Sequence, residues 1–197
     1  MNKKLLIYGA SGHGKVAADI ARHNGYEEIL FYDDDIQKND LGQYKVIHDF
    51  HGCEDHDLFI AIGDNATREK ISLRMQRQLV TLIHPTAVIG EDVQIGQGVV
   101  VMAKAIINPG TILGDGVIVN TCASIDHDNR IGNYAHISVN AHTAGTVTIG
   151  ERTFIGMSAS VINNISICDD ALIGAGALVV EDIREAGTYI GVPAKKK

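Results

Sequence analysis

A six-residue repeat of branched aliphatic residues constrains this chain more than any other feature of its sequence. Counted in steps of six from Ile83 to Val179, sixteen of seventeen positions hold Ile, Leu or Val, and Thr143 is the exception. A second set, mostly of small residues, follows four positions after each of these and runs from Ala87 to Ile183. No insertion interrupts either series.

The period of six predicts a parallel β-helix made of stacked coils, because amphipathic helices repeat every 3.6 residues and strands every two. We expect the branched residues to fill the interior and the small ones to let the chain turn. No hexapeptide buries its own apolar side, so stacking of neighbours supplies the stability. We expect glycine after the aliphatic position to supply backbone angles that other residues avoid; these glycines are Gly90, Gly96, Gly114, Gly132, Gly150, Gly156 and Gly174.

Residues 1–82 lack this period and predict a small Rossmann-like α/β domain. Apolar runs end at Tyr8, Tyr32 and Ile62, and helical spacing covers 15–24 and 67–79. Strands that alternate with helices indicate a parallel sheet. We therefore expect an α/β domain over 1–82, a left-handed β-helix over 83–183 and a tail over 184–197 that covers the last coil.

Candidate ligand-binding residues follow each predicted strand, where parallel sheets bind their ligands. The Gly-rich turn 9–14 has the spacing G-x-x-G-x-G, which differs from the dinucleotide fingerprint G-x-G-x-x-G. Backbone N–H groups at a helix start can receive a phosphate, and carboxylates can accept hydrogen bonds from a ribose or a base. A plain turn and a solvated acidic loop are the alternatives. The candidates are Ser11, Gly12, His13, Asp33, Asp34 and Gly63.

His127 is the candidate general base of the repeat. It lies two residues after the inward Ile125, so its ring is expected to face a groove. A neighbouring carboxylate can fix the imidazole tautomer and raise its basicity, but the spacing leaves open whether Asp126 or Asp128 does so. A solvated surface histidine is the alternative. His136 and His142 could contact a ligand or line a subunit contact.

Charge and composition argue against several classes of function. The net charge of −7 disfavours nucleic acid as a partner. No apolar run reaches about 20 residues, and the first apolar run is too short for a signal peptide. Three unpatterned cysteines are expected to be reduced thiols of a cytoplasmic protein. His51 and His56 lack further ligands, so we expect no metal.

The hexapeptide register, the segment 125–128 and the tail segment 191–195 resemble the left-handed β-helix acyltransferases. The segments 8–14, 31–34 and 60–65 ahead of the repeat resemble the sialic-acid O-acetyltransferase family, and within it the UDP-4-amino-sugar N-acetyltransferases of the bacillosamine pathway. This resemblance covers nearly the whole chain. It implies a homotrimer with acetyl-CoA in the groove between subunits and the UDP-amino-sugar on the N-terminal domain.

The resemblance also assigns roles to individual residues. It implies that His127 is the base and that Asp128, where relatives often carry Glu, assists it. It implies acetyl-CoA contacts at His136, Met157 and Ala175, and nucleotide-sugar contacts at the six residues named above. Lys195 could approach a CoA phosphate. The alternatives are O-acetylation of a sialic acid, N-acetylation of a GDP-linked amino sugar, and a non-enzymatic scaffold.

Overall fold

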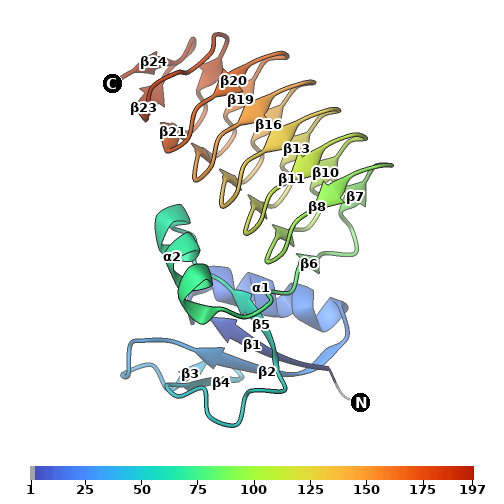
Figure 1. The fold of residues 1–197 in the computed structure, drawn as a ribbon, viewed down its shortest axis with the longest axis vertical. Helices are drawn as coiled ribbons and strands as arrows, with labels where there is room; N and C mark the ends of the chain where they lie inside the picture. The colour runs from blue at the N-terminus through green and yellow to red at the C-terminus, as the bar shows by residue number, and fades with distance from the viewer. Residues whose placement is uncertain (1–2) are drawn as a thin grey trace.

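The computed structural model describes residues 3–197 and consists of an α/β part followed by a β-helix (Figure 1). The α/β part has a five-stranded sheet in the order β3-β4-β2-β1-β5, in which β1 is parallel to both β2 and β5. Its elements are β1 (Lys3–Tyr8), α1 (Gly12–His23), β2 (Tyr26–Tyr32), β3 (Asp40–Leu41), β4 (Tyr44–Ile47), β5 (Asp57–Ile60) and α2 (Asn65–Met75). The predicted parallel sheet is confirmed, and the short antiparallel pair β3–β4 is an addition that no sequence period signalled.

Alternate residues of β1 pack into two different cores. Leu5 and Ile7 belong to the cluster that includes the buried side of α1, whereas Leu6 and Tyr8 pack with Ile71 of α2. Both sides of the strand are therefore buried, which explains its unbroken apolar run. The α1 cluster continues into the β-helix through Val100, Met102 and Ile118, so the two parts share one core.

Each coil of the left-handed β-helix consists of three hexapeptides. Each strand therefore pairs in parallel with the strand three hexapeptides further on, as Ile107 does with Ile125. Three sheets result, and they form the faces of the coil. The strands are β6 (Leu82–Ile83), β7 (Val88–Ile89), β8 (Gln94–Ile95), β9 (Val100–Val101), β10 (Ile106–Ile107), β11 (Ile112–Leu113), β12 (Ile118–Val119), β13 (Ser124–Ile125), β14 (Arg130–Ile131), β15 (His136–Ile137), β16 (His142–Thr143), β17 (Thr148–Ile149), β18 (Phe154–Ile155), β19 (Ser160–Val161), β20 (Ser166–Ile167), β21 (Ala171–Ile173) and β22 (Leu178–Val179).

Both predicted inward series line the interior of the coil. Ile107, Ile125 and Ile137 are fully buried, and so are Ala105 and Ala123 from the second series. They belong to one apolar cluster that runs along the β-helix. The hexapeptide pattern therefore predicted correctly which side chains point inward.

The expected reason for the glycines after the aliphatic position is wrong. None of them has a positive φ; a Cβ on Gly132 would instead lie 2.7 Å from the backbone nitrogen of Glu151 in the next coil. Close approach of neighbouring coils therefore excludes a side chain there. The left-handed backbone occurs three positions after the aliphatic residue, with φ between 54° and 61° at Asp92, Lys104, Cys122, Asp128, Tyr134, Asn140, Thr146, Arg152, Ser158, Asn164 and Asp170.

The tail continues the sheets of the β-helix. The strand β23 (Gly187–Ile190) pairs in parallel with β21, and β24 (Lys195–Lys196) returns antiparallel to β23. Residues 184–197 thus lie against the last coil (Figure 1). None of the helices in residues 3–197 has the length and apolar character needed to cross a membrane.

We expect Gly132→Ala to lower the free energy of unfolding by about 1–3 kcal/mol, the usual cost of overpacking. The added methyl group would meet backbone atoms of the next coil, which cannot move without breaking its hydrogen bonds. Urea unfolding followed by circular dichroism measures the change. Gly12→Ala is the matched control, since a Cβ there meets nothing within 4 Å. Equal stability of both variants would contradict this account.

Candidate active site

His127 and Asp128 form a hydrogen-bonded pair on the corner of the coil that follows β13. The imidazole Nδ1 lies 2.8 Å from Oδ2 of Asp128. Their side chains are 56% and 64% exposed. Asp128 adopts one of the left-handed backbone positions, with φ 59°, which aspartate tolerates better than most residues. When Nδ1 donates to the carboxylate, Nε2 keeps a free lone pair that can take a proton.

The two carboxylates that flank His127 make different contacts. Asp126 accepts from the side-chain amide of Asn108 at 2.8 Å and from the backbone N–H of His127 at 2.8 Å. The Asn108 bond is the main reason why the pKa of Asp126 is lowered. The pKa of His127 is raised, chiefly by its hydrogen bond to Asp128. Asp128 is therefore the carboxylate that contacts the imidazole ring.

Gly145 lies against the imidazole ring of His127 in the next coil. A Cβ on Gly145 would lie 2.5 Å from Nε2 and 2.6 Å from Cε1 of His127. Gly145 was not among the predicted site residues. The signal was present in the coil period, because Gly145 stands three hexapeptides after His127 and is therefore its neighbour along the β-helix axis.

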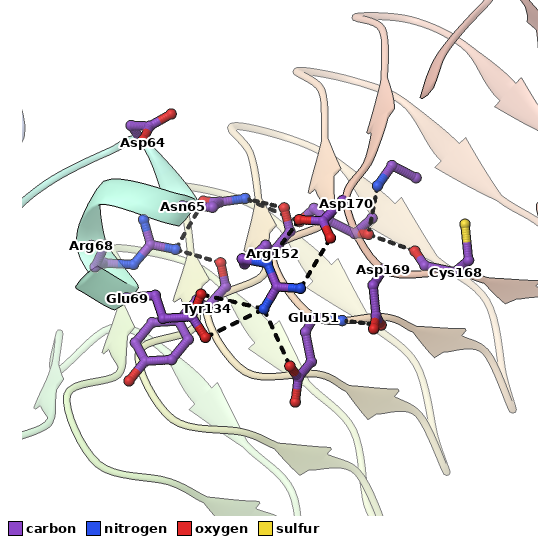
Figure 2. A network of polar contacts seen from close by, with 12 residues as sticks. Asp64, Asn65, Arg68, Glu69, Tyr134, Glu151, Arg152, Cys168, Asp169 and Asp170 are labelled. Carbon is purple, nitrogen blue, oxygen red and sulfur yellow. Dashed lines mark hydrogen bonds and ion pairs between the residues drawn. The ribbon is translucent and has the colours of Figure 1, made fainter. Parts of the chain in front are cut away.

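A buried arginine joins the α/β part to the β-helix. Arg68 of α2 is 2% exposed, and all its hydrogen-bond acceptors are neutral oxygens. Figure 2 shows its guanidinium between Asn65 and Tyr134. The acceptors are the carbonyls of Ile62 (2.9 Å), Gly63 (3.3 Å), Gly116 (2.8 Å) and Tyr134 (2.6 Å) and Oδ1 of Asn65 (2.8 Å). Arg68 thus holds residues 62–63, which follow β5, against two successive coils of the β-helix.

His136 is buried and His13 is half-buried at this junction, and both are held neutral. Burial lowers the pKa of His13 to about 4 and that of His136 to about 3, and the charge of Arg68 acts in the same direction on both. The backbone of Gly63 partly opposes the shift at His136. Nε2 of His136 lies 3.1 Å from the side-chain amide of Asn120. The junction therefore gathers His13 and Gly63, expected to bind the nucleotide sugar, with His136, expected to bind acetyl-CoA.

A cavity of about 360 Å³ opens beside this junction, at the N-terminus of α2. Asp64 caps the helix by accepting from the backbone N–H of Thr67 at 2.8 Å. Arg152 also borders the cavity, but Asp170, Glu69 and Glu151 surround its guanidinium (Figure 2). Its charge is already compensated within the chain. The main lining residues are Gly63, Asn65, Arg152, Phe154, Ala171 and Leu172.

The predicted nucleotide contacts at the ends of β1 and β2 differ in their freedom to bind a ligand. Asp33 is 14% exposed and accepts from the backbone N–H of Ala10 at 2.8 Å and from Lys38 at 2.9 Å. It thereby ties the Gly-rich turn to the end of β2. Asp34 is 61% exposed and accepts from the hydroxyls of Tyr8 and Tyr32.

Two other residues of the Gly-rich turn remain open to solvent. Ser11 and Gly12 are exposed at the start of α1, and the Ser11 hydroxyl makes no capping hydrogen bond. Of the predicted contacts at these strand ends, Ser11, Gly12 and Asp34 are the most accessible, whereas the carboxylate of Asp33 holds the turn.

Met157 and Ala175 lie apart from His127. They occupy the same position on successive coils, at the corner that follows β18 and β21, and both are outside the core. His127 lies at the corner that follows β13. Within one chain the predicted residues therefore form three groups: the His127 corner, the Arg68 junction with the neighbouring Gly-rich turn, and the Met157 corner.

One grouping in residues 3–197 brings possible metal ligands together. Side-chain atoms of Asp19, His23 and His84 lie within 4.8 Å of one another. However, Nδ1 of His84 accepts the backbone N–H of Thr86 at 3.1 Å, so a neutral His84 carries its proton on Nε2. Neither ring nitrogen then offers a free lone pair, and we assign no metal to this group.

We expect the unliganded protein to lose stability as the pH falls from 6.5 towards 4. The pKa of His13 and His136 lies below their ordinary value of 6.5 in the folded chain, so protonation favours the unfolded chain. The contribution of neutral His13 and His136 to the free energy of unfolding is complete above pH 6.5 and declines below it. Thermal unfolding across this range should show a shallower decline for a His13→Asn, His136→Asn double variant. His51→Ala, at a 90% exposed side chain, should leave the decline unchanged; identical profiles for all three proteins would refute the assignment.

Comparison with known proteins places the chain in a family. Residues 4–75 match the family model of the PglD N-terminal domain, and residues 146–180 match that of the bacterial transferase hexapeptide with six repeats. A curated UDP-N-acetylbacillosamine N-acetyltransferase from Bacillus subtilis (strain 168) is 33% identical over 112 residues. That match covers 51% of this chain and 52% of the enzyme, so the chain spans about half the length of this curated relative.

Two groups of solved structures match nearly the whole chain. The acetyltransferase domain of PglB from Neisseria gonorrhoeae FA1090, also solved with acetyl coenzyme A, is 39% identical, with both chains covered completely and a TM-score of 0.94. PerB from Caulobacter crescentus, in complex with CoA and GDP-perosamine, is 38% identical over 98% of this chain and 97% of that chain, with a TM-score of 0.92. The chain belongs to the family of hexapeptide-repeat sugar N-acetyltransferases that carry a PglD-type N-terminal domain.

Proposed function

We propose that this protein transfers the acetyl group of acetyl-CoA to the amino group of a nucleotide-linked amino sugar, with a UDP-linked 4-amino-4,6-dideoxy sugar as acceptor. The observation that carries the proposal is the pair of His127 and Asp128, in which Nε2 of a 56% exposed side chain can take a proton. Relatives that bind acetyl-CoA, or CoA together with GDP-perosamine, support the choice of donor and acceptor class.

The reaction needs one proton acceptor. Nε2 of His127 takes a proton from the sugar amine as its nitrogen attacks the thioester carbonyl. A C–N bond forms, the C–S bond breaks, and the CoA thiol leaves with the proton that His127 returns. Asp128 stabilises the imidazolium formed in between. A backbone N–H, or the neutral His136 of a neighbouring copy, donates to the oxyanion of the tetrahedral intermediate.

In this proposal the acceptor and the donor meet at the Arg68 junction, where His136 lies beside His13 and Gly63. The nucleotide sugar binds Ser11, Gly12, His13, Asp34 and Gly63, while Asp33 orders the turn that presents them. The donor binds His136, Met157 and Ala175. The cavity beside Phe154 and Leu172 offers apolar surface to its pantetheine arm. Holding both substrates together supplies part of the acceleration.

A homotrimer would complete this site. Met157 and Ala175 lie at a different corner from His127, so a groove between two copies can bring one subunit's base to another subunit's donor. The outer face of the sheet that holds β13 also exposes Val88 (57%) and Ile106 (40%), two apolar side chains that a neighbouring copy would cover. With acetyl-CoA and a nucleotide sugar as substrates, we expect the enzyme to work in the cytoplasm.

The identity of the nucleotide separates two forms of this proposal. Bacillosamine-type chemistry requires a UDP sugar, and the PerB relative binds a GDP sugar. O-acetylation of a sialic acid would use the same base and donor with a hydroxyl acceptor. We favour the UDP sugar because the segments 8–14, 31–34 and 60–65 resemble the UDP-amino-sugar enzymes.

We expect His127→Ala to lower kcat by a factor on the order of 10² or more, because the variant lacks the general base. Thiol release from acetyl-CoA measures turnover, and isothermal titration checks that UDP binding is unchanged. His51→Ala, at an exposed histidine of the α/β part, is the matched control.

Asp128→Asn tests the same pair through its pH dependence. His127 acts as a base only when neutral, so kcat/KM rises with pH through its pKa. Since the bond to Asp128 raises that pKa, the variant's acid limb should move to lower pH while its maximal rate falls. In the His127→Ala variant described above, turnover near the wild-type rate would show that His127 is not the general base.

We expect turnover with UDP-4-amino-4,6-dideoxy-N-acetylglucosamine and little or none with GDP-perosamine, CMP-sialic acid or free sialic acid. The measurement is thiol release with each acceptor at equal concentration, with mass spectrometry of the product. Turnover with GDP-perosamine alone would keep the fold and the base but replace the acceptor. Absence of turnover with every acceptor, together with no binding of acetyl-CoA, would refute the enzymatic function and favour a non-enzymatic scaffold.

A further inference from the structure

A polar side chain lies inside the β-helix directly behind the His127 corner. Asn129 occupies an inward position of the small series and is fully buried. The same position in other coils holds Val93, Val147 and Ile165. Apolar side chains therefore fit at this position of the coil, so packing alone does not require an asparagine there.

The side-chain amide of Asn129 binds backbone on both sides of the imidazole. Nδ2 donates to the carbonyls of Asp126 (2.9 Å) and His127 (3.1 Å) in its own corner. It also donates to the carbonyl of Ala144 (2.9 Å) in the next coil. Ala144 immediately precedes Gly145, the residue against which the His127 ring lies. One buried amide thus links the backbone that carries the ring to the backbone that the ring contacts.

A second buried polar residue extends this arrangement to the preceding coil. Thr111 occupies the position of Asn129 one coil earlier, and its hydroxyl donates to the carbonyl of Asp126 at 3.0 Å. The same hydroxyl accepts the backbone N–H of Asn129 at 3.3 Å. The His127 corner is therefore bound from inside by side chains of its own and the preceding coil.

The side-chain oxygen of Asn129 shows that only the NH2 group of this amide forms hydrogen bonds. Oδ1 is buried and has no hydrogen-bond partner within the described residues. An unpartnered buried acceptor is destabilising, so the oxygen of this amide offsets part of the stability that its donor bonds supply. What the residue adds is the donor group, and all three of its contacts fall beside His127.

We propose that Asn129 is a positioning residue for His127. Its amide holds the backbone of residues 126–127 at a fixed distance from residues 144–145, so that the imidazole stays between the Asp128 carboxylate and Gly145. Nδ1 then keeps its bond to Asp128 and Nε2 remains the nitrogen that meets the substrate amine. This inference rests on the proposed function, in which His127 is the base.

The test replaces the amide by side chains that occur in the same inward series. Asn129→Val copies Val147, and Asn129→Ala copies alanines such as Ala123; neither side chain carries a donor. Thr143→Val is the matched control: it also removes a buried polar group from the core beside this corner, and its hydroxyl has no partner among the described residues. Each full-length protein is assayed for kcat, for KM of both substrates and for thermal unfolding.

We expect both Asn129 variants to lower kcat by about 10- to 100-fold, the loss typical of a misplaced catalytic group, with both KM values within about twofold of wild type. Thr143→Val should keep wild-type kcat. Lowered thermal stability of the Asn129 variants with unchanged kcat would overturn the inference, because it would show a purely structural role. If Asn129→Val fails to fold, Asn129→Ala decides.

A second readout does not depend on the acceptor. Long-range proton–nitrogen NMR spectra of the unliganded protein, with the His127 signals assigned by their absence in His127→Ala, report the imidazole tautomer and its titration. In wild type and Thr143→Val the proton should sit on Nδ1, with a raised pKa. In the Asn129 variants the tautomers should mix and the pKa should fall. Unchanged His127 spectra would refute the positioning role, whereas altered spectra in a protein without turnover would refute only the proposed function.

Discussion

The parallel hydrogen bonding between successive coils is the constraint on which the rest of this structure depends. It decides which side chains are neighbours along the β-helix, because each position lies beside the positions three hexapeptides before and after it. His127 meets Gly145 for this reason, and Met157 lies beside Ala175. A single inserted residue would shift every later side chain to a different face, which explains the uninterrupted register.

Arg68 makes the two parts of the chain act as one body. A buried charge without a carboxylate partner is costly unless its donors are satisfied, and here Ile62, Gly63, Gly116 and Tyr134 supply carbonyls on both sides of the junction. The same charge helps to keep His13 and His136 neutral. Arg68 thus contributes both to the position of the α/β part on the β-helix and to the neutral state of His13 and His136, whose pKa burial lowers most.

The sequence predicted the fold well because the hexapeptide period reports directly which side chains are buried. It also placed His127 outside the core, but the choice between Asp126 and Asp128 required side-chain geometry that spacing alone does not contain. Arg68 was missed because a lone arginine in a polar helix gives no sign of burial, and its partners include backbone carbonyls far away in the sequence. The role of the glycines was misassigned because a sequence does not distinguish a strained φ from close contact between coils.

The tail of the chain has a consequence for how this protein behaves in a crowded solution. A stack of parallel strands ends in unpaired backbone groups, which can template addition of another chain. Here residues 181–197 pair with all three final strands: Ile183 bonds β20, Gly191 and Ala194 bond β22, and β23 bonds β21. The outermost strand of the sheet that holds β21 is β24, which runs antiparallel and consists of two lysines. The charge and the direction of β24 therefore disfavour the addition of another chain to this sheet.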